Sequence, residues 1–345
     1  MTKLSHQNQP GGSILYINSN RIQSLDLLRG LAACSVMVFH FTAESTIELS
    51  DTNPLRITGV YGHYGVDVFF ILSGLVIPYS MYRASYSISS LGNFLLKRTI
   101  RLEIPFLALI ALEVVAIYLS SLASWKEGVS ERMDAFNILL HIGYLNGILD
   151  RPWLIPVFWT LAIEFQFYLL IGFIFFLLST RNFAIRNSTL AALALLSFVI
   201  PHPDLFFRYG LLFLLGIVLF QLMCSIINPR EFSFWSIVLF ILVYFQHGSI
   251  SFFLSVLTVT IIIVVKGEWR WSNFLGMISY SLYLVHIPFG GRLLMLTNMH
   301  VKSELIRSML ILGYLPLTIF AAWLFFLFFE RPSVLLSKKI SYKKT

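Results

Sequence analysis

Residues 26–43 read DLLRGLAACSVMVFHFTA, and this stretch decides the fold class. Apart from Asp26, Arg29 and His40, it consists of apolar or small side chains. A run of roughly 20 such residues is what an α-helix needs to cross the hydrocarbon core of a bilayer. The stretch therefore predicts a first membrane-spanning helix, which we expect to be retained rather than cleaved as a signal peptide.

The composition extends this conclusion to the whole chain. Of 345 residues, 57% are hydrophobic and 12% are charged, whereas soluble domains carry about 25% charged residues. Because so few charged residues cannot cover a water-exposed surface of this size, we expect the apolar surface to face a lipid bilayer. The net charge is +8. The Lys and Arg residues lie in short gaps between apolar runs and form no basic stripe, which argues against nucleic-acid binding.

Further apolar runs predict an all-α, polytopic integral membrane protein with about ten spans. Residues 135–149 are apolar but short and interrupted by glycine, and we expect a re-entrant or interfacial piece there. The expected spans are 26–43, 64–82, 102–122, 156–178, 188–201, 205–227, 232–247, 250–265, 274–296 and 305–329.

Lys and Arg gather in alternate loops, which by the positive-inside rule predicts that both termini are cytoplasmic. We expect a polar N-terminal tail over 1–24, a transmembrane domain over 25–332 and a basic cytoplasmic tail over 333–345. The two cysteines, Cys34 and Cys224, lie in apolar runs and indicate no disulfide framework.

Ionisable residues inside predicted spans are the first candidates for function, because burying them in lipid is costly. Arg29 and His40 are eleven residues apart, so they project from one helix face about 16 Å apart along the axis. Asp26 is one turn before Arg29 and could pair with it. A lone intramembrane histidine is often a satisfied core residue, but with Arg29 in register the pattern favours catalysis.

Two carboxylates fall in later spans. Asp67, in the second span, needs a partner such as His63 or an arginine, and a helix-orienting pair is as good an account as a substrate role. Glu164, in the fourth span with Tyr168 beside it, must be paired, protonated or lining a cavity.

Lys97, Arg98 and Arg101 cluster before the third span. Guanidinium forks suit phosphate oxygens, although a plain positive-inside flank has the same composition. His286, taken alone, indicates a structural role. Glu330 and Arg331 indicate a local pair at the end of the last span.

Other sites have weaker support or none. Glu113 in the third span has no account from the sequence. The sequence contains no GxSxG, HExxH, CxxC or glycine-rich phosphate loop, and its histidine spacing predicts no metal site.

Six motifs in chain order resemble the bacterial acyltransferase-3 family of membrane-bound acyltransferases, over about residues 21–332. Each motif is weak alone, but six in order on ten expected spans are specific. They are SLDLLRGLAA…VFH, YGVDVFFILSG, KRTIRLEIPF, FWTLAIEFQFYLL, ISYSLYLVH and FERP.

The resemblance implies an enzyme of the bacterial cytoplasmic membrane that transfers acyl groups other than amino-acyl groups. Its donor would be acyl-CoA, with acetyl-CoA expected, and its acceptor a carbohydrate hydroxyl; no permanently bound cofactor is implied. Arg29 and His40 match the family's Arg-x10-His pair. Arg98 and Arg101 match its R-x-x-R pair, associated with the donor, and Glu164 and Tyr168 fall in its Trp…Glu…Tyr stretch.

These observations indicate a mechanism of acyl transfer with two possible routes. His40 would act as general base on the acceptor hydroxyl, Arg29 would steady the donor or developing charge, and Glu164 could orient His40 or the sugar. A covalent acyl-His40 intermediate is an open alternative. A transporter or flippase for a saccharide or lipid-linked substrate is the alternative function.

Overall fold

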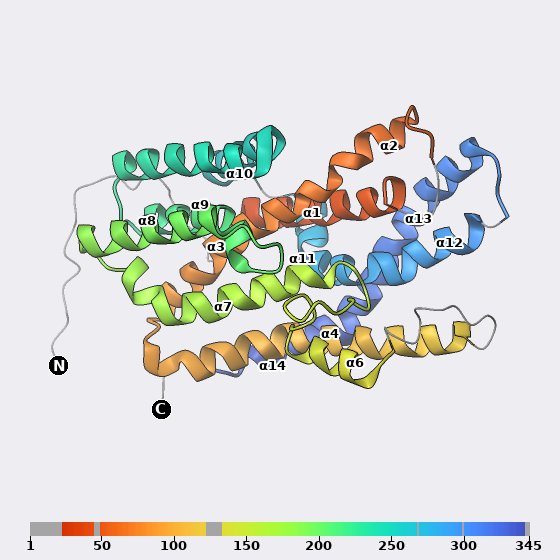
Figure 1. Ribbon diagram of the computed structural model, residues 1–345, viewed down its shortest axis with the longest axis horizontal. Coiled ribbons are helices and arrows are strands. Elements are labelled where there is room, and N and C mark those ends of the chain that lie inside the picture. Colours follow the sequence, from red (N-terminus) through yellow and green to blue (C-terminus); the bar gives the residue numbers. More distant parts are fainter. Residues whose placement is uncertain (1–22, 45–48, 122–132, 268, 299, 342–345) are drawn as a thin grey trace.

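A computed structural model describes residues 23–44, 49–121, 133–267, 269–298 and 300–341. Within these residues the chain is helical and contains no strand. Residues 1–22 of the expected N-terminal tail lie outside the described part. Figure 1 shows most of the long helices running side by side along one direction, as expected for a membrane bundle.

Eight helical stretches in the described part are long and apolar enough to cross a membrane. Shorter helices connect or flank them: α2 (Pro54–Gly59), α6 (Ala135–Ile142), α12 (Arg292–Asn298) and α14 (Arg331–Lys338). The long helices are α1 (Gln23–Thr42), α3 (Gly65–Arg83), α4 (Leu91–Ser121), α7 (Phe158–Leu178), α9 (Gly210–Met223), α10 (Pro229–Val264), α11 (Arg270–Val285) and α13 (Glu304–Phe325), where α9 is lengthened by the 3₁₀ turn Phe206–Tyr209 before it.

The expectation of ten spans differs from these eight at two places. Helix α8 (Phe183–Val199) is apolar but only 17 residues long. Helix α10 has 36 residues and contains two expected spans, 232–247 and 250–265; it is broken between them at Gly248, whose φ is 86°. Only glycine adopts that conformation readily. The number of crossings and the side on which each terminus lies stay predictions.

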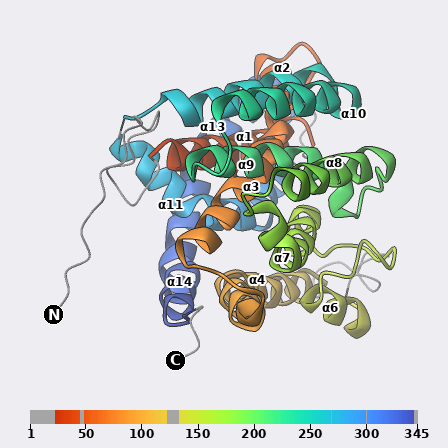
Figure 2. The ribbon, with the colours of Figure 1, turned by 90° about the vertical axis from the view of Figure 1, so that its left-hand side faces the viewer.

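The helices approach closely where small residues remove side-chain bulk. Gly74 of α3 packs so tightly on α9 that a Cβ atom there would lie 2.1 Å from the carbonyl oxygen of Phe213. From the other side, a Cβ at Gly216 of α9 would lie 2.1 Å from the carbonyl oxygen of Ile71. The α3–α9 pair is thus tightly packed, and Figure 2 shows the two helices next to each other near the middle of the bundle.

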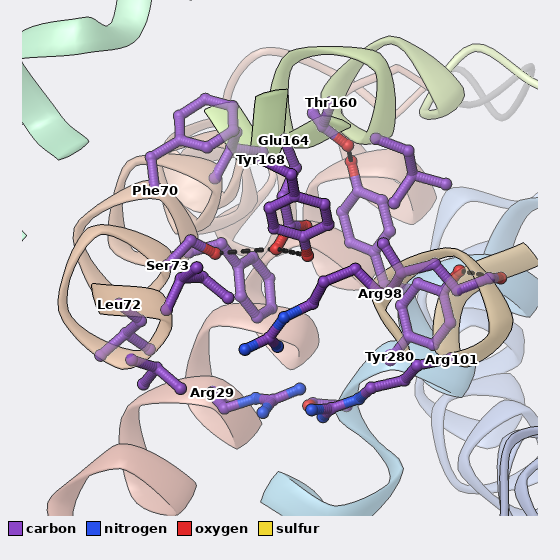
Figure 3. A pocket seen from close by; sticks show the side chains of 18 of the residues that line it. Arg29, Phe70, Leu72, Ser73, Arg98, Arg101, Thr160, Glu164, Tyr168 and Tyr280 are labelled. Atoms are coloured by element: carbon purple, nitrogen blue, oxygen red, sulfur yellow. Dashed lines mark hydrogen bonds between the residues drawn. The ribbon is translucent and has the colours of Figure 1, made fainter. Parts of the chain in front are cut away.

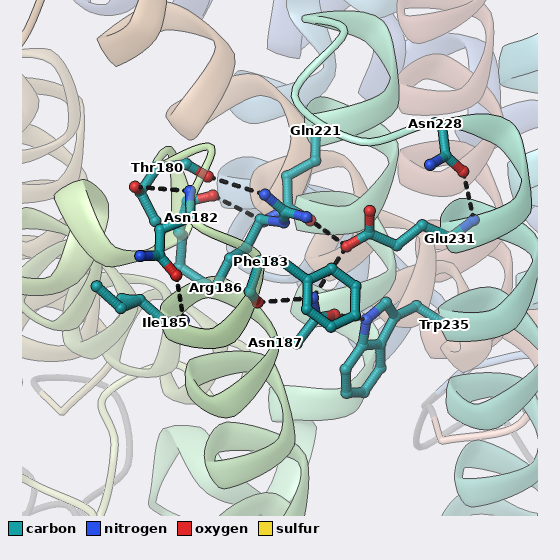
Figure 4. A network of polar contacts seen from close by, with 11 residues as sticks. Thr180, Asn182, Phe183, Ile185, Arg186, Asn187, Gln221, Asn228, Glu231 and Trp235 are labelled. Atoms are coloured by element: carbon teal, nitrogen blue, oxygen red, sulfur yellow. Dashed lines mark hydrogen bonds and ion pairs between the residues drawn. The ribbon is translucent and has the colours of Figure 1, made fainter.

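A buried polar network fixes the orientation of α8 against α10 (Figure 4). Arg186 of α8 is 2% exposed and forms an ion pair with Glu231 of α10. Asn187 donates to the same carboxylate at 3.0 Å, and Arg186 also donates to the carbonyl of Thr180 at 3.0 Å. This network lies apart from the cavities described below, so we assign it to stability.

Two connecting segments are also ordered. Residues 135–149, expected as a short re-entrant piece, begin with α6 (Ala135–Ile142) and continue in turns. The expected tail over 333–345 begins inside α14 (Arg331–Lys338), which follows a π-helical turn after α13. Ser333 of α14 donates to the carbonyl of Arg101 at 3.1 Å, so α14 lies against α4.

Candidate active site

A first cavity, here the arginine cavity, opens between α1, α3, α4, α7 and α11 (Figure 3). Its volume is about 110 Å³. Three arginines and two glutamates line it, which leaves one formal positive charge. These residues are Arg29, Arg98, Arg101, Glu164 and Glu330.

Arg98 is held rigidly at the edge of this cavity. Its Nη2 donates to Ser80 Oγ at 2.7 Å, and its guanidinium lies 5.7 Å from the ring centre of Phe94 and 5.8 Å from that of Tyr168. Its Nε is buried and has no hydrogen-bond partner within the described residues. A planar, preorganised donor with a free N–H is suited to an anionic ligand.

Glu164 is hydrogen-bonded on one carboxylate oxygen. Oε1 accepts from Tyr168 OH at 2.6 Å and from Ser73 Oγ at 3.0 Å (Figure 3). These bonds join α7 to α3 and aim the carboxylate into the arginine cavity. No hydrogen bond joins Glu164 to His40 in the described structure and the two line different cavities, so an orienting role toward His40 has no support here, whereas the role toward the sugar stays a prediction.

Glu330 also lines the arginine cavity, into which Arg29 and Arg101 point (Figure 3). It is 4% exposed, and its Oε2 accepts from Ser281 N at 3.1 Å and Ser281 Oγ at 2.6 Å. The expected local pair of Glu330 with Arg331 is wrong. Adjacent residues on a helix point about 100° apart, so Glu330 faces the bundle interior while Arg331 is exposed.

A second, larger cavity, here the histidine cavity, has a volume of about 410 Å³. It is lined by ionisable and aromatic side chains from α1, α3, α7, α10 and the turns around them. They include His40, Glu44, His63, Asp67, Trp159, Arg208, Tyr209 and His247. Within the described residues, no group of three or more His, Cys, Asp or Glu side chains is placed to hold a metal ion.

His40 has a carboxylate partner in this cavity. Its Nδ1 lies 2.6 Å from Oε2 of Glu44, and the hydrogen bond from His40 lowers the pKa of Glu44. A carboxylate only accepts hydrogen bonds, so Nδ1 is the donor, and in the neutral imidazole Nε2 then carries the free lone pair. This arrangement holds the His40 ring in one orientation.

Asp67 has a different partner from those expected. Ser251 of α10 donates to its Oδ2 at 2.6 Å, and no ion pair joins Asp67 to His63 or to Arg208 in the described structure. The carboxyl group lines the histidine cavity, so the bond both ties α3 to α10 and presents an acceptor to a bound molecule.

The two cavities share two wall residues, Val66 and Tyr283. Helix α1 passes both cavities, with Arg29 at the first and His40 at the second. The bundle therefore contains an arginine-lined and a histidine-lined cavity that adjoin at Val66 and Tyr283.

A model of the acyltransferase domain family, acyltransferase-3, matches residues 22–329. The chain belongs to this acyltransferase-3 family. It is accordingly an acyltransferase, and the transporter alternative is not supported. No curated protein and no solved structure matches the chain.

Two other predicted candidates of this acyltransferase lie outside both cavities. Asp26 packs against α11, where a Cβ at Gly276 would lie 2.6 Å from Asp26 Cβ. His286 is fully buried; its Nδ1 lies 3.1 Å from the carbonyl of Leu282, and its ring centre lies 5.0 Å from that of His40. Its Nε2 has no partner within the described residues.

Several functional candidates in the acyltransferase were missed from the sequence. Glu44 is four residues after His40, a spacing that brings side chains together, so this signal was available. Ser73, Ser251 and Tyr283 gave no sequence signal, because hydroxyl groups are common in membrane helices. Glu113, left without an account, forms an ion pair with Arg292 at 2.6 Å.

Proposed function

We propose that the protein transfers an acyl group from acyl-CoA, bound in the arginine cavity, to a hydroxyl of a carbohydrate in the histidine cavity. The observation that carries this proposal is the pair of cavities that meet at Val66 and Tyr283. An arginine-lined compartment suits a polyanionic donor, and a compartment with a positioned base suits a hydroxyl acceptor.

The charge of the arginine cavity supports its assignment to the acyl donor. Coenzyme A carries phosphates, and guanidinium groups bind phosphate oxygens with two parallel hydrogen bonds. Arg98 and Arg101 lie on α4 and Arg29 on α1, and all three line one cavity. By the positive-inside rule this end faces the cytoplasm, where acyl-CoA is available, and the setting is the bacterial cytoplasmic membrane with about ten crossings.

The aromatic and hydrogen-bonding side chains of the histidine cavity support its assignment to the carbohydrate acceptor. The ring centres of Trp159 and Tyr209 lie 5.2 Å apart, and both rings line the histidine cavity. They offer flat apolar faces, while Asp67 and Gln246 offer polar groups to hydroxyls. Mixed apolar and polar linings of this kind are typical of small-molecule sites.

The chemistry follows from the free lone pair on His40. Nε2 takes the proton of the acceptor hydroxyl as its oxygen attacks the thioester carbonyl carbon. The C–S bond then breaks, an ester forms, and the thiolate of coenzyme A takes up the proton. Alternatively, Nε2 itself attacks the thioester and the acyl group moves from His40 to the hydroxyl in a second step; both routes use the same residues.

The test uses purified protein in nanodiscs with acetyl-CoA and a carbohydrate acceptor extract from the cell envelope. We expect thiol release coupled to ester formation, and a loss of about 10²–10⁴-fold in His40→Ala. Saturable acetyl-CoA binding should remain in that variant and disappear in Arg98→Ala/Arg101→Ala. Arg181→Ala, an exposed arginine that lines neither cavity, is the matched control. Undiminished transfer by His40→Ala would remove His40 from the mechanism, and absence of acyl-CoA binding would overturn the donor assignment.

A further inference from the structure

Two side chains form part of the wall of both cavities, and we refer to them as the partition. Val66 of α3 and Tyr283 of α11 each line both the arginine cavity and the histidine cavity. An acyl group that enters on the arginine side has to pass this point to meet His40. In the proposed reaction, the space around these two side chains therefore limits which acyl groups reach His40.

The hydroxyl group of Tyr283 is hydrogen-bonded to one residue of each cavity. Its oxygen lies 2.7 Å from Thr160 Oγ1, which lines the arginine cavity (Figure 3), and it donates to the carbonyl of Val157, which lines the histidine cavity, at 3.2 Å. The Tyr283 ring is 6% exposed. It also packs edge-on against Phe69, with 5.8 Å between ring centres.

Close packing of α3 on α1 fixes the backbone position of Val66. The neighbouring Gly65 packs so closely on α1 that a Cβ there would lie 2.5 Å from Ser35 Oγ and 2.6 Å from the carbonyl oxygen of Ala32. Interiors packed at this density transmit strain and do not yield locally. The width of the passage is therefore set by the side chains of Val66 and Tyr283.

The partition also lies beside the proposed base. The Tyr283 ring centre is 5.8 Å from that of His286, which is 5.0 Å from that of His40. Three residues after Tyr283, α11 is followed by a π-helical segment, His286–Gly291. Such segments are frequent at functional sites, and this one begins at His286, whose ring lies between those of Tyr283 and His40.

We propose that Val66 and Tyr283 determine the acyl-chain length, so that the enzyme transfers short acyl groups such as acetyl and rejects longer chains. This inference rests on the proposed function. When the thioester carbonyl stands at the passage, the acyl tail has to fit against the Tyr283 ring. A two-carbon group fits in a narrow passage, whereas a six-carbon tail collides with the ring.

The test compares transfer from acetyl-CoA and hexanoyl-CoA. We expect wild type to prefer acetyl, and the hexanoyl-to-acetyl rate ratio to rise on the order of tenfold in Val66→Ala and further in Tyr283→Ala, since small changes in apolar pocket volume discriminate by such factors. Val68→Ala is the matched control, because Val68 is also a valine of α3 but lines neither cavity. An unchanged ratio in both partition variants, with acetyl transfer intact, would overturn the inference and leave the proposed function standing.

A second measurement needs no transfer activity. In a Cys34→Ser/Cys224→Ser background, Val76→Cys places a thiol in the arginine cavity. A membrane-impermeant thiol reagent applied from the histidine side should label it only when Tyr283→Ala is also present. Labelling without that substitution would show that no partition exists, and no labelling with it would show that Tyr283 is not the barrier.

Discussion

Nδ1 of His40 lies 2.6 Å from Oε2 of Glu44, the residue four positions later in the chain. Because Glu44 can only accept, it fixes the tautomer in which Nε2 is unprotonated. A carboxylate in this position also stabilises the imidazolium that forms when Nε2 takes a proton. The pair therefore gives His40 the properties of a general base.

Replacing Glu44 with glutamine should lower acyl transfer by about tenfold to a hundredfold, the range found when the carboxylate or carbonyl partner of a metal-bound histidine is removed. Glutamine can still accept a hydrogen bond but does not stabilise the imidazolium. The measurement is the transfer rate at saturating acetyl-CoA. In a His40→Ala background, Glu44→Gln should have no further effect; a further loss there would show that Glu44 acts independently of His40.

The same pair predicts a pH dependence of stability. The hydrogen bond from His40 lowers the pKa of Glu44 below its ordinary value, so the stabilisation is present above the unfolded pKa, about 4.3. It is lost as the pH falls through the lower folded pKa. Wild type should melt at a higher temperature than Glu44→Gln at pH 6, and the gap should close below about pH 4. A gap that widens on acidification would contradict the assignment.

Arg98→Lys should weaken acyl-CoA binding roughly tenfold to a hundredfold, since a hydrogen bond to a charged group contributes about 1.5–3 kcal/mol. Lysine keeps the charge but loses the planar fork that bonds Ser80 and stacks between Phe94 and Tyr168. Calorimetric titration with acetyl-CoA measures the change. Arg181→Lys should bind like wild type, and equal weakening in both variants would argue for a general charge effect.

The sequence predicted the parts of this molecule that depend on local pattern. Apolar runs located the membrane helices, and even the break at Gly248 falls between the two spans expected at 232–247 and 250–265. The one-face argument placed Arg29 and His40 on a helix that passes both cavities.

What the sequence could not predict depends on contacts between distant helices. Ser251 reaches Asp67, and Ser281 reaches Glu330, only because α10 and α11 pack on partners far away in the chain. The adjacency of Glu330 and Arg331 in the sequence indicates a pair, but helix geometry separates adjacent side chains. Pairing in a helix bundle is decided by packing, which a single sequence does not display.

Arg186→Ala should destabilise the protein without altering the cavities. Removing Arg186 leaves Glu231 as a buried charge without its ion-pair partner (Figure 4), and breaking a buried pair costs about 3–5 kcal/mol. We expect a large fall in melting temperature in detergent, with acetyl-CoA affinity unchanged in the folded fraction. Arg181→Ala, an exposed substitution five residues earlier, should shift stability by no more than about 0.5 kcal/mol; similar losses in both would show that the pair contributes little.

Gly74→Ala tests the tight contact between α3 and α9. A Cβ at this position would lie 2.1 Å from the carbonyl oxygen of Phe213, and backbone cannot move aside as a flexible side chain can. Overpacking of this kind costs about 1–3 kcal/mol, and sometimes more, so the melting temperature should fall clearly. Gly92→Ala is the matched control, because no heavy atom lies within 4 Å of a Cβ there and alanine favours helix by up to about 1 kcal/mol. If Gly74→Ala were as stable as Gly92→Ala, α3 and α9 would not be in the close contact that positions Ser73 beside Glu164.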